Sequence, residues 1–299
     1  MDLVVPVTAP PPGLLARLWQ YQRERFPLAA HGVLVAVFVF GVTAYGAQGT
    51  PALARLLAAA VVVLLAFFLL RVADEHKDAA MDARYRPERA VPRGLVTLAQ
   101  LRRLAFAAAV VQLGLALMLG PRALLALGGV WAFGALMTAE FFAPTWLRAR
   151  SAAYLATHLG VLPLLDLFSM VVGAGTAPLP GGFGALLAMA YAGGGVFEVG
   201  RKVRAREDER EGVETYSAAW GLPRALAVWM GFVAVSAVTL GTVAGPALQA
   251  GFAAGVLLLG LSAVWIARRP APSRVALVER ASGLWLVALY VALGLTFAR

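Results

Sequence analysis

Residues 53–73 read LARLLAAAVVVLLAFFLLRVA, and residues 74–82, which follow directly, read DEHKDAAMD. The first stretch is apolar over a length that lets an α-helix cross the hydrocarbon core of a bilayer. It shows no alternation of apolar and polar residues, so a membrane helix is predicted rather than a barrel strand. The second stretch places four acidic residues at the end of that helix. This one segment therefore indicates both the fold and the position of its polar chemistry.

The composition of the whole chain agrees with a membrane protein. Of 299 residues, 61% are hydrophobic and 14% are charged, and the mean hydropathy is +0.77. A soluble domain carries about 25% charged residues, so an ordinary soluble globular protein is excluded. Cysteine is absent, which excludes disulfide bonds, a thiol nucleophile and a thiolate metal site.

Eight further apolar stretches have the length of membrane spans: 29–48, 101–119, 122–142, 152–173, 183–200, 222–242, 247–267 and 280–298. We predict an all-α polytopic membrane protein with about nine transmembrane helices around a central cavity. Residues 1–28 are expected to form an N-terminal tail and an interfacial amphipathic helix, and residues 29–299 a single nine-helix transmembrane domain. The second and sixth helices are expected to continue past the lipid, because charged, helix-compatible sequence follows them.

The distribution of charge predicts the topology. Lys and Arg number 26 and Asp and Glu 16, which gives a net charge of +10. Basic residues crowd the N-terminal segment and the connections after the second, fourth, sixth and eighth spans, whereas 174–182 and 243–249 carry no charge. This positive-inside pattern predicts an N-terminus in the cytoplasm and a C-terminus outside. We expect an integral protein of the bacterial inner membrane, in contact with membrane lipids. The pattern disfavours nucleic acid as a partner.

The segment after the second span is a candidate metal and phosphate site. Asp74, Asp78 and Asp82 recur at i, i+4 and i+8, which on a helix is one slowly drifting face. Three aligned carboxylates repel one another, and a hard divalent cation such as Mg²⁺ relieves that repulsion. Arginines suited to phosphate oxygens follow at positions 84, 86, 89 and 93. The alternative is a solvated helix end on which these acids form i,i+4 pairs with nearby basic residues.

A second acidic and basic segment follows the sixth span. Residues 197–221 read FEVGRKVRAREDEREGVETYSAAWG. Alternating charge is a weak signal when it stands alone. However, both segments are expected at the same membrane face, and each is joined to an apolar helix.

Together, the two segments resemble the signatures of the UbiA family of intramembrane prenyltransferases. The first signature of that family is Asn-Asp-x-x-Asp-x-x-x-Asp, followed by an Arg-Pro-x-x-Pro-x-Gly-like turn. The counterpart here is Asp74-Glu75-x-x-Asp78-x-x-x-Asp82, then Arg86-Pro87-x-Arg89-x-x-Pro92-x-Gly94. Asp74 stands where the family usually has Asn, and Glu75 where it usually has Asp.

The second family signature is an aspartate-rich run that leads into Gly-x-x-Thr. Gly212-x-x-Thr215 matches it, Asp208 lies four residues before the glycine, and Glu198 matches a frequent upstream Glu. Arg201 and Arg204 stand where the family usually has earlier aspartates. The resemblance extends over nearly the whole chain after residue 15.

The resemblance implies Mg²⁺-dependent transfer of an isoprenoid chain from its diphosphate to a lipophilic or aromatic acceptor. It implies metal ligands at Asp74, Asp78, Asp82 and Asp208, with Asp78, Asp82 and Asp208 also catalytic. Diphosphate contacts are expected from Arg86, Arg89, Arg201, Lys202 and Arg204. Metal and guanidinium groups at these positions would stabilise the charge of the departing diphosphate.

Two questions stay open on the sequence alone. Arg201 and Arg204 either bind the diphosphate directly, with Asp208 or Glu207 kept as a ligand, or mark the loss of two-metal chemistry. The alternative to an enzyme is a membrane transporter, or a binding protein for lipid or prenyl diphosphate, in which intramembrane Glu140 and Asp166 mark a transport path.

His158 is a further candidate, for a role beside the acceptor as a base or hydrogen-bond partner. It lies four residues after Tyr154 and eight before Asp166, on roughly one helix face. The simpler interpretation of His158 and Asp166 is a hydrogen bond between helices.

Overall fold

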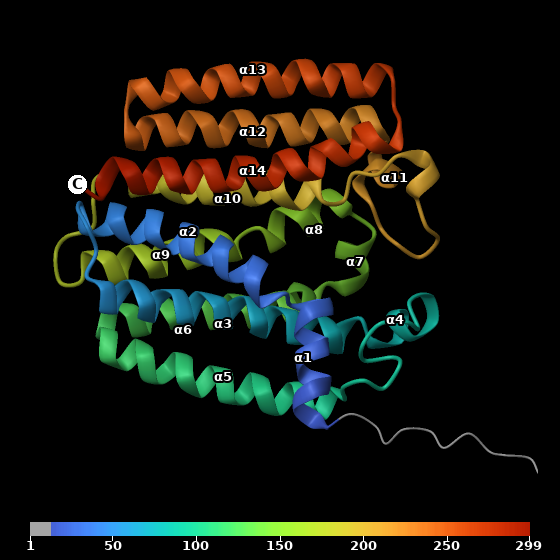
Figure 1. Ribbon diagram of the computed structural model, residues 1–299, viewed down its shortest axis with the longest axis horizontal. Coiled ribbons are helices and arrows are strands. Elements are labelled where there is room, and N and C mark those ends of the chain that lie inside the picture. The colour runs from blue at the N-terminus through green and yellow to red at the C-terminus, as the bar shows by residue number, and fades with distance from the viewer. Residues whose placement is uncertain (1–12) are drawn as a thin grey trace, which may run out of the picture.

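The computed structural model describes residues 13–299, and in that part of the chain every regular element is a helix (Figure 1). The predicted tail at 1–12 lies outside the described residues. The first half contains α1 (Leu14–Arg25), α2 (Leu28–Ala47), α3 (Leu53–Lys77), α4 (Ala79–Tyr85), α5 (Leu98–Leu119), α6 (Pro121–Thr138), η1 (Glu140–Phe142) and α7 (Pro144–Arg148). The second half contains α8 (Ser151–His158), α9 (Val161–Ala174), α10 (Phe183–Gly200), η2 (Arg206–Asp208), α11 (Tyr216–Trp220), α12 (Leu222–Ala244), α13 (Pro246–Arg268) and α14 (Pro272–Phe297).

The prediction of nine spans is confirmed: between residues 13 and 299, nine helical segments are long and apolar enough to cross a membrane. Eight are single helices, and the fifth, Ser151–Ala174, is α8 followed by α9. The spans lie side by side, and their charged connections gather at one end (Figure 1). We call this end, which carries residues 71–97, 139–151 and 201–221, the charged face. α1 runs crosswise to the spans there, and its predicted place at a membrane surface stays a prediction.

Two predicted helix ends are wrong. The fourth span ends at Thr138 instead of residue 142, so Glu140 belongs to the charged face and not to the span. The sixth span ends at Gly200 and does not continue as a helix into the charged segment. The reason is tertiary: the backbone N–H of Tyr216 donates to the carbonyl of Lys202 (3.0 Å), so the chain folds back on itself after α10.

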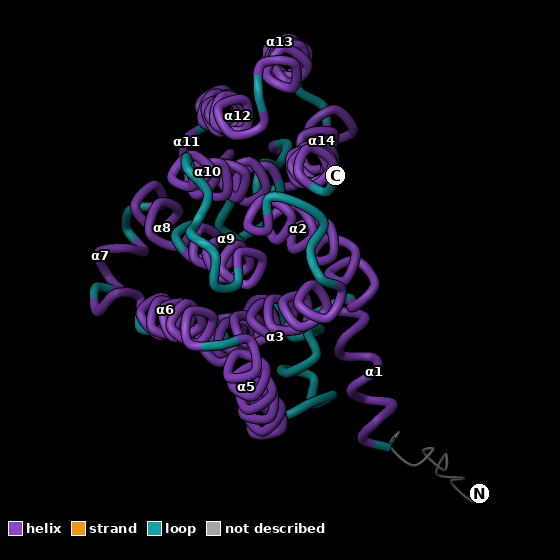
Figure 2. Tube along the Cα trace, turned by 90° about the vertical axis from the view of Figure 1, so that its left-hand side faces the viewer, coloured by secondary structure: helices purple, strands orange, loops and turns teal. Residues whose placement is uncertain are grey.

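Small residues bring the inner helices close together. α2, α9, α10 and α14 lie in the middle of the bundle, whereas α5 and α13 lie at opposite edges (Figure 2). In α2 and α9, a Cβ at Gly46 would collide with the carbonyl of Met170, and one at Gly173 with the carbonyl of Thr43. Since helix association in lipid depends on close van der Waals packing, these glycines allow α2 to contact α9 directly.

Buried polar pairs link further helices. The indole N–H of Trp229 donates to Ser282 Oγ (2.8 Å), and that of Trp285 to Ser236 Oγ (3.0 Å). Both pairs join α12 to α14. Each satisfies a donor that has no access to water in the hydrocarbon, which is the condition for a buried tryptophan in such a bundle.

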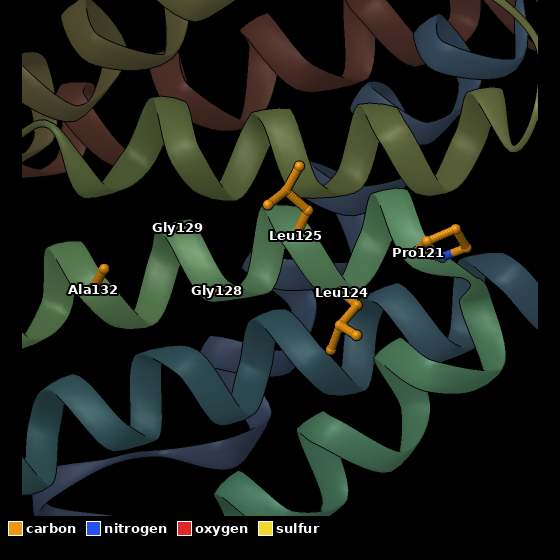
Figure 3. A pocket seen from close by; sticks show the side chains of 6 residues that line it. All are labelled: Pro121, Leu124, Leu125, Gly128, Gly129 and Ala132. Atoms are coloured by element: carbon orange, nitrogen blue, oxygen red, sulfur yellow. The ribbon is translucent and has the colours of Figure 1, made fainter.

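The inner helices enclose a small apolar cavity. A cavity of about 30 Å³ lies between α2, α3, α9, α10 and α14, with Phe38, Leu162 and Tyr290 among its apolar lining. Next to it, the Tyr290 hydroxyl donates to the carboxylate of fully buried Asp166, at 3.3 Å from each oxygen. Asp166 therefore joins α9 to α14 through a hydrogen bond between helices, which is the simpler of the two interpretations given for this residue from the sequence. An open apolar groove of about 810 Å³ runs along the exposed surface of α6 (Figure 3).

Candidate active site

Three segments that are far apart in sequence meet at the charged face. α3 and α4 carry the aspartates, η1 and α7 connect the fourth span to the fifth, and 201–221 follows α10 (Figure 1). The aspartate segment contacts the third segment at Gly212, where a Cβ would lie 2.7 Å from the Tyr85 ring. The indole N–H of Trp220 donates to Ser151 Oγ (2.8 Å), which joins the third segment to the fifth span.

Asp78 lies at the junction between α3 and α4. Its φ and ψ of −91° and 1° interrupt the helix, yet the backbone bonds from Asp78 to Asp74 and from Asp82 to Asp78, both 2.8 Å, keep the i−4 pattern. The three aspartates thus stay on neighbouring turns. Asp78 is partly buried, and within residues 13–299 no cationic side chain lies within 4.0 Å of its carboxylate. Asp74 has a half-exposed side chain and only long ion pairs, at 3.8 Å to Arg71 and 4.0 Å to Lys77.

The electrostatics around Asp78 fit a divalent cation. Burial raises the pKa of the Asp78 carboxyl, Lys77 lowers it, and the neighbouring carboxylates of Asp74 and Asp82 raise it. A cation placed between Asp74 and Asp78 would reverse the unfavourable contribution of these acids. Mg²⁺ is usually held by one or two carboxylates together with water and phosphate oxygens, and these two residues supply that number.

Asp82 has a different environment. It is buried, and its carboxylate accepts from Arg86 Nη1 (3.1 Å) and Arg89 Nη1 (2.7 Å). The turn that follows bends at Gly94, whose φ of +78° favours glycine. Asp82 therefore fixes two of the predicted diphosphate-binding arginines in place.

The basic residues of the second segment are also paired. Glu198 accepts from Arg201 Nε (2.6 Å) and lies 2.9 Å from Lys202 Nζ. Arg204 instead turns towards α14, where its Nη1 lies 3.3 Å from Glu279. Asp208 is exposed on the short turn η2. Arg201 and Lys202 thus form one group with Glu198, and Arg204 is held apart from them.

The four predicted metal ligands are not gathered into one group. Within the described part of the chain, no three acidic or histidine side chains converge at the spacing of a metal site. Asp74 has only long ion pairs, Asp82 is held by two arginines, and Asp208 is exposed. Metal binding by these residues stays a prediction.

Glu75, at the position where the similar family usually has Asp, is used for another purpose. It is buried and pairs with Arg25 of α1 at 2.6 Å. The adjacent Glu24 accepts from Arg93 Nη2 at 2.7 and 2.9 Å. These two pairs attach α1 to both ends of the aspartate segment.

Sequence reasoning missed the central position of Lys77. Its Nζ donates to the Tyr154 hydroxyl (2.8 Å) and lies 3.9 Å from Glu140 and 4.0 Å from Asp74. Glu140 is buried and also pairs with Arg148 at 3.2 Å. The only signal in the sequence was a single cation within an acidic run, and Tyr154 lies 77 positions away, so its pairing with Lys77 was not visible.

Comparisons with known proteins identify the family and the fold of the chain. A model of the UbiA prenyltransferase family matches residues 33–288. A structure described as digeranylgeranylglyceryl phosphate synthase superposes with a TM-score of 0.67 at 14% identity, over 94% of this chain and 98% of the other. An apo UbiA homologue from Aeropyrum pernix K1 gives a TM-score of 0.62 at 17% identity, covering 89% and 96% of the two chains.

A UbiA homologue from Archaeoglobus fulgidus, bound to GPP and Mg²⁺, gives a TM-score of 0.60 at 16% identity, over 92% of this chain and 98% of the other. Comparison with curated protein sequences gives no match. The structural similarities show a shared fold, and the family model covers well over half of the residues. The chain, an integral membrane protein with nine spans, therefore belongs to the UbiA prenyltransferase family.

Proposed function

We propose that the protein is a Mg²⁺-dependent intramembrane prenyltransferase, which moves an isoprenoid chain from its diphosphate to a lipophilic or aromatic acceptor. The observation that carries the proposal is the pair of incompletely neutralised carboxylates, Asp74 and Asp78, beside the ordered arginines Arg86 and Arg89. A site with carboxylates for a cation and arginines for an anion suits a complex of Mg²⁺ with a diphosphate better than it suits Mg²⁺ alone or a diphosphate alone.

The residues have distinct proposed roles. Asp74 and Asp78 would hold Mg²⁺, which when bound neutralises charge on the departing diphosphate. Arg86 and Arg89, oriented by Asp82, would donate hydrogen bonds to diphosphate oxygens as the carbon–oxygen bond breaks. The apolar chain would enter the cavity between the inner helices, which must widen because its present volume is about 30 Å³.

Basic and acidic residues of the second segment also have proposed roles. Arg201 and Lys202 are proposed to contact the diphosphate from the side opposite the aspartates, since both are partly exposed and share one carboxylate. Arg204 is proposed as a weaker contributor because it pairs with Glu279. Asp208 is proposed as a ligand that joins the site only after the turn at η2 moves.

The solved homologues support the choice of donor. Structures of the Archaeoglobus fulgidus homologue are bound to GPP or to DMAPP together with Mg²⁺. We further propose that the charged face lies in the cytoplasm of a bacterial cell and that the C-terminus lies outside, as the positive-inside pattern indicates.

The test is Mg²⁺-dependent binding and turnover of geranyl diphosphate by the detergent-purified protein, with Asp78→Asn as the variant. We expect binding that EDTA removes, and a fall in product formation of at least about 100-fold in Asp78→Asn, because charge stabilisation in the transition state is lost. The control is Glu211→Gln, an exposed acid of the second segment that lies outside the proposed site.

The outcomes separate the two functions considered. Mg²⁺-dependent binding of geranyl diphosphate without turnover, whatever acceptor is supplied, would favour a prenyl-diphosphate-binding protein over an enzyme. Equal binding by wild type and Asp78→Asn, or no binding by either, would contradict the proposed site.

A further inference from the structure

Of the three histidines, one has a ring nitrogen that is both buried and without a hydrogen-bond partner among residues 13–299. His31, His76 and His158 each place Nδ1 near the carbonyl oxygen four residues earlier, at 3.0, 2.8 and 2.9 Å. A carbonyl only accepts, so Nδ1 carries the hydrogen and the neutral ring keeps its lone pair on Nε2. Within residues 13–299, His158 is the only histidine whose Nε2 is buried without a hydrogen-bond partner.

The His158 ring lies beside the proposed diphosphate site. It stacks on the Tyr154 ring with 3.8 Å between ring centroids, and the Tyr154 hydroxyl accepts from Lys77. Lys77 directly precedes Asp78 in the chain. His158 is also the last residue of α8, and Leu162, four positions on, lines the central cavity. The ring is therefore linked to the aspartate segment through Tyr154 and Lys77, and it belongs to the same span as Leu162.

Unusual backbone geometry accompanies this ring. Glu140, Phe141 and Phe142 have φ values of 47°, 51° and 59°, a left-handed conformation that is costly for residues other than glycine. The turn places the Phe141 ring edge-on to His158, with 5.8 Å between centroids. A buried nitrogen without a partner destabilises the fold, and each strained residue adds to that cost. Such costs gather where a ligand later supplies the missing contact.

We propose that His158 Nε2 accepts a hydrogen bond from the hydroxyl group of the prenyl acceptor and takes its proton during transfer. The acceptor class is thus a hydroxyl compound, and the rings of Phe141 and Tyr154 favour an aromatic one. The acceptor oxygen forms a bond to C1 of the prenyl chain as the C1–O bond of the donor breaks. The diphosphate leaves with the electron pair, and the hydroxyl proton goes to Nε2. This inference rests on the proposed function.

The kinetic test uses His158→Gln with geranyl diphosphate, Mg²⁺ and phenol as the acceptor probe. We expect transfer to phenol to fall about 100-fold or more, the usual contribution of a general base, with unchanged binding of geranyl diphosphate. With ring-fluorinated phenols, which give up their proton more easily, the fall in transfer rate caused by His158→Gln should be smaller. A purely structural role for His158 would not give this dependence on acceptor acidity.

Two further variants keep the test decisive. His31→Gln is the matched control, because His31 makes the same Nδ1 contact but lies at the start of α2, outside the site. His158→Asn keeps a side-chain N–H for the Tyr154 carbonyl and removes the base. Retained binding of geranyl diphosphate shows that either variant is folded. If His158→Gln and His158→Asn transfer to phenol as fast as wild type, the proposal is wrong.

A direct measurement needs no turnover. In protein labelled with ¹⁵N-histidine, only three side chains contribute signals. Adding phenol should shift the Nε2 resonance of His158 and leave His31 and His76 unchanged. If geranyl diphosphate and Mg²⁺ bind but phenol neither shifts this resonance nor accepts the chain, the inference fails while the proposed function stands. If geranyl diphosphate does not bind, the proposed function itself fails.

Discussion

Asp78 and Asp82 lie four residues apart, but their carboxylates have opposite electrostatic surroundings. Asp82 is neutralised by Arg86 and Arg89, whereas Asp78 is desolvated beside other acids. At the residue scale the partners of a charged group decide its role. The sequence showed the spacing of the aspartates and allowed an i,i+4 pair between Asp82 and Arg86, but it did not show that Asp82 also binds Arg89.

A first prediction concerns the ion pair between Glu24 and Arg93. The hydrogen bond from Arg93 holds the pKa of Glu24 below its ordinary 4.5. A lowered pKa means that the pair stabilises the fold fully above the ordinary pKa, and that this stability is lost as the pH falls through the lower folded-state pKa. Glu24→Gln should therefore lower Tm by about 1–3 °C at pH 7, since a partly exposed pair contributes about 0.2–1 kcal/mol.

Thermal unfolding of the purified protein checks this. The difference between Glu24→Gln and wild type should shrink as the pH is lowered through the acidic range. Glu211→Gln, an exposed acid without such a pair, should match wild type at each pH. A difference that grows on acidification would rule out this linkage.

At the scale of elements, glycines decide which helices touch. Gly46 and Gly173 let α2 and α9 approach through backbone contacts that no side chain would allow. The sequence shows 31 glycines without indicating which of them lie at such contacts. Gly128, by contrast, does not lie at a close helix contact, since a Cβ there would meet nothing within 4 Å.

We expect Gly173→Ala to destabilise the bundle by about 1–3 kcal/mol, because the added Cβ would collide with the carbonyl of Thr43. Gly128→Ala, in the middle of α6, should be neutral or slightly stabilising because alanine favours the helix. Thermal unfolding in detergent compares the two. An equal Tm for both variants would contradict the close contact of α2 with α9.

At the scale of the whole molecule, the bundle has one charged and one nearly uncharged end. Residues 13–299 contain nine spans, so the described chain begins and ends at opposite ends of the bundle. The positive-inside pattern predicts that the charged face lies in the cytoplasm. The absence of cysteine makes this easy to examine by labelling.

Single cysteines should report the orientation. Thr176→Cys, exposed between α9 and α10, should react with a membrane-impermeant maleimide added to intact spheroplasts. Arg206→Cys, exposed on the charged face, should react only after lysis. The reverse pattern would overturn the proposed topology.

The sequence by itself determined the all-α class, the nine spans and the segments that carry the charge, because hydropathy and helix length are local properties. It also indicated the family, through motif spacing. It did not predict the end of α10 at Gly200, after which Tyr216 bonds back to Lys202, or the left-handed turn at Glu140. Only the tertiary structure decided that Asp82 binds Arg89 as well as Arg86, that Asp166 pairs with Tyr290, and that His158 Nε2 lacks a partner among residues 13–299. These outcomes depend on contacts beyond one regular helical turn, and a linear pattern does not encode such contacts directly.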